Sequence, residues 1–480
     1  MKKLALPTPI TTMLGAVAVP GVTATRRTRV AARSFALDDQ HLFRSVNSLA
    51  IPIITENLFQ TMLGIVDLIM VGRLGAVAIA GVGTALQIMF IVLGALSAIT
   101  IGTTVLVARF AGAEDPAQAA RVVKQSLLLG VACSAIIAVV GHIVAHPVIA
   151  LLGAPPAVTR AGGDYLDIVC VTSVTLVVQF VCASALRGAG DTRTSMIVTG
   201  LVNIVNIVVA YALIFGHFGL PALGVVGSAW GASAARAVGA LVLLALLASG
   251  WRRVSIAGRG GWRPDAGLMR RVMRIGLPSM MEQTFMNSGM LLYSIIVIGM
   301  GTAAYAAQRI TFNALNISFM PGLGFGLAAT TMTSQALGAG RVDLARRSTN
   351  ISFYLAALWM CTMGAALFLF GNPIMHLFSN DPTIDRIGTD ALRVIALSQP
   401  FQALGQVMAG SLRGAGDTRF PMVATGLAIW LVRLPFGWLF GVPLHGGLPG
   451  VYISNVMDAV VRAAANYLRF RRGLWHKMRV

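Results

Sequence analysis

Apolar runs of about 20 residues recur along the whole chain, and they constrain its fold more than any other feature. Each run is long enough to cross a lipid bilayer as a helix. Charged residues make up only 11% of the 480 residues, whereas a soluble domain usually carries about a quarter. The runs are continuous rather than alternating, which argues against a membrane β-barrel. The sequence therefore predicts an all-α polytopic membrane protein.

Twelve membrane-spanning helices are predicted from these runs. They cover 49–71, 84–107, 122–145, 165–186, 194–216, 224–248, 275–299, 310–335, 350–371, 390–412, 420–441 and 450–469. With the N-terminus inside, the cytoplasmic segments hold 29 Lys or Arg residues and the outer segments about four. Since basic residues stay on the cytoplasmic side, both termini are predicted to be cytoplasmic. This placement explains the net charge of +20 without a nucleic-acid partner.

An internal duplication relates the two halves of the chain. The octapeptide LRGAGDTR occurs at 186–193 and again at 412–419, 226 positions later. The same offset, without gaps, aligns further pairs: Pro52 with Pro278, Glu56 with Glu282, Gly75 with Gly301, and Arg236 with Arg462. This pattern predicts a repeated six-span unit. Because six is even, the copies are predicted to be parallel repeats related by an axis along the membrane normal.

The predicted organisation follows from the two repeats. We expect a disordered basic cytoplasmic tail, an N-lobe of spans 1–6, a cytoplasmic linker, a C-lobe of spans 7–12 and a basic C-terminal tail. Their ranges are 1–45, 46–248, 249–274, 275–470 and 471–480. A targeting segment, or a start codon assigned too early, is the alternative for the first 40 residues.

Each copy of the octapeptide lies at the predicted cytoplasmic end of a span. Its arginine and aspartate are candidate hinge or latch residues: Arg187, Asp191, Arg413 and Asp417. The alternative is a simple connector, in which glycine ends one helix, aspartate caps the next and arginine anchors the turn at the membrane surface.

The chain resembles the multidrug and toxic compound extrusion (MATE) family. The resemblance rests on ENLFQTMLGIVDLIMVGRLG (56–75), both copies of LRGAGDTR, and NIVVAYALIFG (206–216), and it covers nearly all of the chain after residue 45. It implies a twelve-span antiporter of the plasma (bacterial inner) membrane with two lobes around a central cavity. Such proteins export organic cations and other amphipathic compounds in exchange for protons or sodium.

Ionisable side chains inside spans are costly and are functional candidates. Span 1 places Glu56, Gln60 and Asp67 on one helical face, because 11 residues at 100° each separate the outer two by only about 20°. Glu56 has a duplicate in the second repeat, whereas Asp67 aligns with Tyr293. A lone carboxylate shielded from water can load and release a proton near neutral pH.

The resemblance adds to this ranking of span 1. Asp67 aligns with the aspartate at which family members bind the coupling ion, and Asn206 in span 5 matches a position near it. Asn203 lies on the same face of span 5. A second family aspartate is replaced here by Ala210, which favours protons over sodium, because sodium would need more oxygen ligands. A salt bridge between Asp67 and Arg73 at the interface is the alternative.

A substrate-cavity wall is predicted on span 7, with one residue of span 10. The candidates are Glu282, Met286, Met290, Tyr293 and Gln402. Other family members carry carboxylates at the positions of Met286 and Gln402. Methionine gives a soft, adaptable surface suited to varied ligands. Ordinary helix packing is the alternative.

Several classes of function are disfavoured. The four cysteines lie in apolar runs without metal-type spacing, and no catalytic set falls within the spans. We therefore expect no enzyme activity, no metal and no cofactor beyond the coupling ion. The partners expected are a small cationic or amphipathic substrate, the coupling cation and the bilayer, with the protein a monomer. A flippase for lipid-linked precursors, of a related fold, is the runner-up function.

Overall fold

The computed structural model describes residues 42–250, 254–258, 260–379 and 381–478. All regular structure in this part of the chain is helical. The helices are α1 Leu42–Gly72, α2 Ala76–Gly112, α3 Pro116–Leu151, α4 Pro156–Val171, α5 Ser173–Gly188, α6 Thr192–Phe215, α7 Val225–Ala248, α8 Ala266–Ile298, α9 Thr302–Gly338, α10 Val342–Leu369, α11 Gly371–Phe378, α12 Pro382–Ala396, α13 Gln399–Ala415, α14 Arg419–Leu427, α15 Leu434–Gly441 and α16 Gly447–Arg471. A π-helical turn, Ala428–Arg433, joins α14 to α15, and a 3₁₀ turn, Leu474–Lys477, follows α16. The predicted tail falls outside the described residues up to residue 41.

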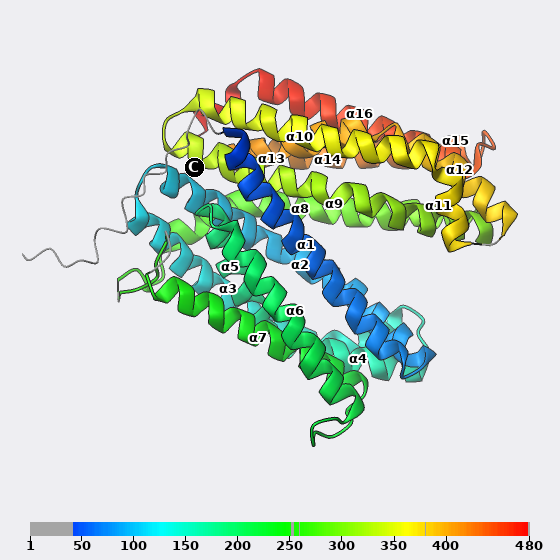
Figure 1. Cartoon of the computed structure of the whole chain (residues 1–480), viewed down its shortest axis with the longest axis horizontal. Helices are drawn as coiled ribbons and strands as arrows, with labels where there is room; N and C mark the ends of the chain where they lie inside the picture. The colour runs from blue at the N-terminus through cyan, green and yellow to red at the C-terminus, as the bar shows by residue number, and fades with distance from the viewer. Residues whose placement is uncertain (1–41, 251–253, 259, 380, 479–480) are drawn as a thin grey trace, which may run out of the picture. The chain divides into compact units, whose positions relative to one another are not determined.

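The helices agree with the predicted all-α membrane fold, and each predicted span coincides with one helix or one broken helix (Figure 1). Within the described residues, seven helices are long and apolar enough to cross a membrane, or eight if α4 and α5, bent by 55°, form one span. Among those that do not qualify are α8, α9 and α16 of the second repeat. Polar residues such as Gln308 in α9 and Asp458 in α16 lower the hydropathy of these helices.

The duplication is visible in the helix boundaries. α2 and α9 begin and end at positions 226 apart, and so do the beginnings of α3 and α10 and of α4 and α12. Gly75 and Gly301, which precede α2 and α9, have φ values of 107° and 109°. Side chains rarely adopt this conformation, so both copies need glycine there.

The two repeats exchange the beginnings of their first helices. One buried core is built from α2 to α7 and also includes Leu268, Val272 and Ile275 of α8. A second core is built from α9, α10 and α13 and includes Val46 and Ile53 of α1. The lobes are therefore held together by reciprocal packing of two symmetry-related helices.

A close contact between the lobes lies where α2 and α9 end. Gly112 packs directly on the backbone of Gln335, and Gly338 packs on the backbone of Arg109. The 226-residue offset relates Arg109 to Gln335 and Gly112 to Gly338, so each pair is the counterpart of the other and the contact lies on the pseudo-twofold axis. Side chains reinforce it, because Gln335 Nε2 donates to the Gly188 carbonyl at 2.8 Å. These ends carry the loops predicted to be cytoplasmic.

The linker between the lobes is docked on α3. Lys124 Nζ donates to the carbonyls of Gly258 at 3.0 Å and Gly260 at 2.6 Å. Asp265 then caps α8 by accepting from the backbone N–H of Leu268 at 3.1 Å. Because this cap starts the helix at residue 266, α8 begins inside the range predicted as linker, 249–274.

The C-terminal segment is also docked. Trp475 is fully buried and its ring stacks on Phe470 with centroids 4.8 Å apart. Arg109 Nη2 of α2 donates to the carbonyl of Met478 at 3.3 Å. The described part of the predicted tail therefore contacts both lobes.

Candidate functional site

Asp67 and Asn206 form a buried pair between α1 and α6. Asn206 Nδ2 donates to Asp67 Oδ1 at 2.8 Å. Both side chains are only 1% exposed. The structure thus brings together the carboxylate and the amide that the sequence singled out on separate spans.

The remaining oxygens of this pair have unused acceptor capacity. Asp67 Oδ2 and Asn206 Oδ1 are buried without a hydrogen-bond partner among the described residues. Arg236 of α7 is close enough to interact electrostatically with Asp67, and Tyr165 of α4, which is 1% exposed, is a further neighbour of this carboxyl group. A carboxylate with one hydrogen-bonded oxygen and one open oxygen can accept a proton at the open oxygen. Burying such a group without its full set of hydrogen-bond partners costs free energy, which points to a functional role.

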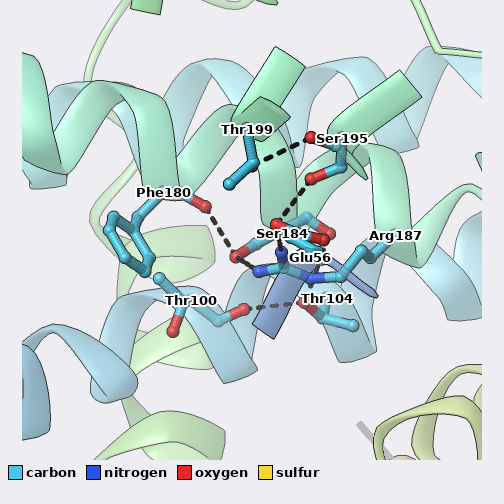
Figure 2. A network of polar contacts seen from close by, with 8 residues as sticks. All are labelled: Glu56, Thr100, Thr104, Phe180, Ser184, Arg187, Ser195 and Thr199. Carbon is cyan, nitrogen blue, oxygen red and sulfur yellow. Dashed lines mark hydrogen bonds and ion pairs between the residues drawn. The ribbon is translucent and has the colours of Figure 1, made fainter. Parts of the chain in front are cut away.

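Glu56 lies on the same helix but belongs to a different network (Figure 2). Its Oε1 accepts from Arg187 Nη1 at 2.7 Å and from Ser195 Oγ at 2.8 Å. Arg187 also donates to Ser184 Oγ at 3.0 Å. Glu56 is 2% exposed, so the arginine of the octapeptide neutralises a buried charge inside its own lobe.

The second repeat contains the same glutamate–arginine pair, with a hydroxyl donor from a different position. Arg413 Nη1 donates to Glu282 Oε2 at 2.9 Å, and Thr425 Oγ1 donates to Glu282 Oε1 at 3.2 Å. Glu282 is buried. This glutamate, predicted as a cavity residue, is therefore held by an ion pair.

The aspartates of the octapeptide each bind a group at the end of their helix. Asp191 caps α6, because its Oδ1 accepts from the backbone N–H of Thr194 at 3.2 Å. Asp417 accepts from Arg469 Nε of α16 at 2.8 Å. Both turns keep a left-handed glycine, with φ of 83° at Gly190 and 92° at Gly416.

The other predicted coupling residues lie apart from Asp67. Asn203 Nδ2 donates to the carbonyls of Phe59 at 3.0 Å and Thr199 at 3.1 Å, which ties α6 to α1. Gln60 is exposed. Tyr165 was not selected from the sequence, because an aromatic residue in an apolar span carries no signal of its neighbours.

The predicted cavity residues of the second repeat are less uniform. Met286, Met290 and Gln402 are half-buried. Tyr293 is fully buried, and its hydroxyl donates to the carbonyl of Val451 at 3.0 Å. Two hollows, of about 630 and 650 Å³, lie instead at helix ends and in the linker, beside Asp164 and Lys124 respectively.

Comparison with known proteins bears on these lobes directly. The MatE family profile matches residues 52–212 and 278–439. These two blocks start 226 positions apart and coincide with the two repeats. A relative from Thermotoga maritima named "Probable multidrug resistance protein NorM" is 32% identical over 433 residues, covering 90% of this chain and 93% of the relative.

The chain belongs to the MATE family. "Multidrug resistance protein PmpM" from Pseudomonas aeruginosa is 28% identical over 402 residues, covering 82% of this chain and 83% of the relative. The MATE fold is shown by a crystal structure described as MATE in the bent conformation, with a TM-score of 0.85, 23% identity, and coverage of 91% of this chain and 98% of that one. The matched family and relatives are transporters rather than enzymes.

Proposed function

We propose that this MATE-family protein is a secondary active antiporter that exports amphipathic or cationic organic compounds across the bacterial plasma membrane in exchange for protons. The relatives named as multidrug resistance proteins support export of such compounds. The observation that carries the coupling mechanism is the buried Asp67–Asn206 pair with its open carboxylate oxygen.

Coupling of transport to proton flow requires Asp67 to alternate between an ionised and a protonated state. The ionised form accepts the Asn206 hydrogen bond at Oδ1, and the protonated form carries its proton on Oδ2. A proton changes the charge of a group that is 1% exposed, so it changes the packing that the N-lobe prefers. Sodium would need more oxygen ligands than this pair supplies.

The lobes supply the conformational change. In the structure the ends of α2 and α9 that are predicted to face the cytoplasm are in contact. Alternating access requires this contact to open in the second state of the cycle. The intralobe Glu–Arg pairs would keep each lobe rigid during that motion.

The test is ethidium transport in proteoliposomes, driven separately by a proton gradient and by a sodium gradient. Wild type should show proton-driven transport, and Asp67→Asn should lose the gradient-driven part. Asp390→Asn is the matched control, because that carboxylate is 52% exposed. Sodium-driven transport would overturn the assigned ion. Proton-driven transport that persists in Asp67→Asn would overturn the assigned residue.

A further inference from the structure

The C-lobe position equivalent to the coupling aspartate is occupied by Tyr293. Its ring lies under the guanidinium of Arg433, with Cζ 4.5 Å from the ring centroid. Tyr452 adds a second ring, its centroid 6.1 Å from that of Tyr293. Cations held on aromatic faces in this way are stabilised and oriented. An acid with an amide in one lobe thus corresponds to a tyrosine with an arginine in the other.

A π-helical turn accounts for the position of Arg433. The 226-residue offset aligns Asn206 with Val432, not with Arg433. Ala428–Arg433 is π-helical, and each such turn accommodates one extra residue. This moves Arg433 onto Tyr293, just as Asn206 contacts Asp67. π-helical turns of this kind occur often at functional sites.

Arg433 keeps unused hydrogen-bonding capacity. Among the described residues, no carboxylate lies within 4.0 Å of its guanidinium, and its buried Nε has no hydrogen-bond partner. The nearby Asp458 is taken by Arg462, whose Nη2 donates to it at 2.7 Å. Arg433 as a whole is half-buried. A desolvated cation without an acid partner is costly unless an anion pairs with it.

We propose that Arg433 binds the carboxylate of amphipathic substrates that carry one. The planar guanidinium offers two parallel donors to a carboxylate, and the Tyr293 ring fixes its plane. This proposal rests on the proposed export function and adds to it a specificity-determining residue, Arg433, for amphiphiles that carry a carboxylate beside a cationic group. Tyr293 lies on the face of α8 that the sequence predicts as cavity wall.

The test measures the interaction between the side chain and the ligand carboxylate. Rhodamine B and its ethyl ester differ only in whether the carboxylate is free. Their binding to purified protein in detergent is followed by fluorescence anisotropy, for wild type and Arg433→Gln. For each dye, the affinity of wild type is divided by that of Arg433→Gln. The two ratios together form a double-mutant cycle, which isolates the contribution of the interaction between the Arg433 side chain and the dye carboxylate. Arg309→Gln is the matched control, because Arg309 is an exposed arginine of α9 in the same lobe.

The expected result is selective. Arg433→Gln should weaken rhodamine B binding about tenfold, equivalent to about 1.4 kcal/mol, and change ester binding less than about twofold. Arg433→Lys keeps the charge without the planar donors, so its affinity for rhodamine B should fall between those of wild type and Arg433→Gln. This variant also guards against a folding defect in the glutamine variant. Equal losses for both dyes, or rhodamine B binding no tighter to wild type than to Arg433→Gln, would overturn the proposal.

Failure of this proposal can be told apart from failure of the export function. The binding assay uses no ion gradient, so a selective loss would stand even if neither dye were transported in proteoliposomes. Conversely, proton-driven transport of the ester without any selective loss would leave the export function intact and remove the role of Arg433.

Discussion

A single methyl group at Gly112 tests whether the α2–α9 contact is the closed gate of a transport cycle. A Cβ at this position would lie 2.7 Å from the carbonyl carbon of Gln335 and closer still to its oxygen. Real Cβ atoms essentially never come within 3.0 Å of a backbone atom, so Gly112→Ala requires the two helix ends to separate.

The size of the effect follows from the neighbouring contacts. Overpacking a tight interface costs about 1 to 3 kcal/mol. Separation would also weaken the hydrogen bond from Gln335 Nε2 to the carbonyl of Gly188. A cost of about 1 to 3 kcal/mol on this state alone shifts the equilibrium towards the opened gate about 5- to 150-fold.

The assay is maleimide labelling of Ser334→Cys in a variant whose four native cysteines are replaced. Ser334 is fully buried between the lobes, so labelling reports opening of the contact. Gly83→Ala is the matched control, because Gly83 lies in the same helix and an added Cβ there meets no atom within 4 Å. The labelling rate should rise at least about fivefold in Gly112→Ala over Gly83→Ala.

A labelling rate equal in the two variants, with both proteins eluting as folded species, would refute this reasoning. It would mean that the contact either relaxes without opening or does not limit access to Ser334. A fall in the rate would show that opening occurs elsewhere.

Two further changes test the supports of the lobes. Arg187→Met should lower the free energy of unfolding by about 3 to 5 kcal/mol, because it leaves Glu56 buried without its cation. Arg393→Met removes one member of an exposed pair and should lower it by no more than about 1 kcal/mol. Thermal unfolding of both variants measures the difference, and equal unfolding midpoints would contradict it. Lys124→Met should release the linker, because it removes the hydrogen bonds from Lys124 Nζ to linker carbonyls such as that of Gly260. Limited proteolysis should then cut the linker faster than in wild type. An unchanged cleavage rate would count against the docking of the linker on α3.

The sequence was sufficient for the fold because the apolar runs and the duplication are both one-dimensional signals. Asp67 could be found in the same way, since a lone acid in an apolar span stands out without knowledge of its neighbours. Its pairing with Asn206 required only that spans 1 and 5 pack side by side. The resemblance to the MATE family supplied that packing, which residue spacing alone does not.

The Glu–Arg pairs were harder to predict. Glu56 and Arg187 are both visible as duplicated residues, but 131 positions separate them. Whether the arginine points to the membrane surface or back into the lobe depends on how the end of α5 packs on α1. Side-chain direction at a helix end is set by tertiary contacts, which no periodicity records.

The contact between Arg433 and Tyr293 could not be predicted from the constant offset that revealed the repeats. A constant offset aligns Asn206 with Val432, and the extra residue of the π-helical turn disturbs no alignment beyond it. The helix returns to register at its end, because α15 ends at Gly441, 226 positions after the end of α6 at Phe215. A local change in helix type can therefore alter a site while the sequence register stays intact.

The two lobes show which parts of a duplicated unit can diverge. Each lobe keeps its buried glutamate with an octapeptide arginine, and removing one member of such a pair is strongly destabilising whatever the lobe does. The pair formed by Asp67 and Asn206 carries no such penalty, because both of its members are neutral when the acid is protonated. In the second lobe the corresponding site holds Tyr293 with Arg433, which has the opposite charge. Under the two proposals above, an acid in one lobe and a guanidinium in the other would treat the two charges of a substrate differently, which two identical lobes could not do.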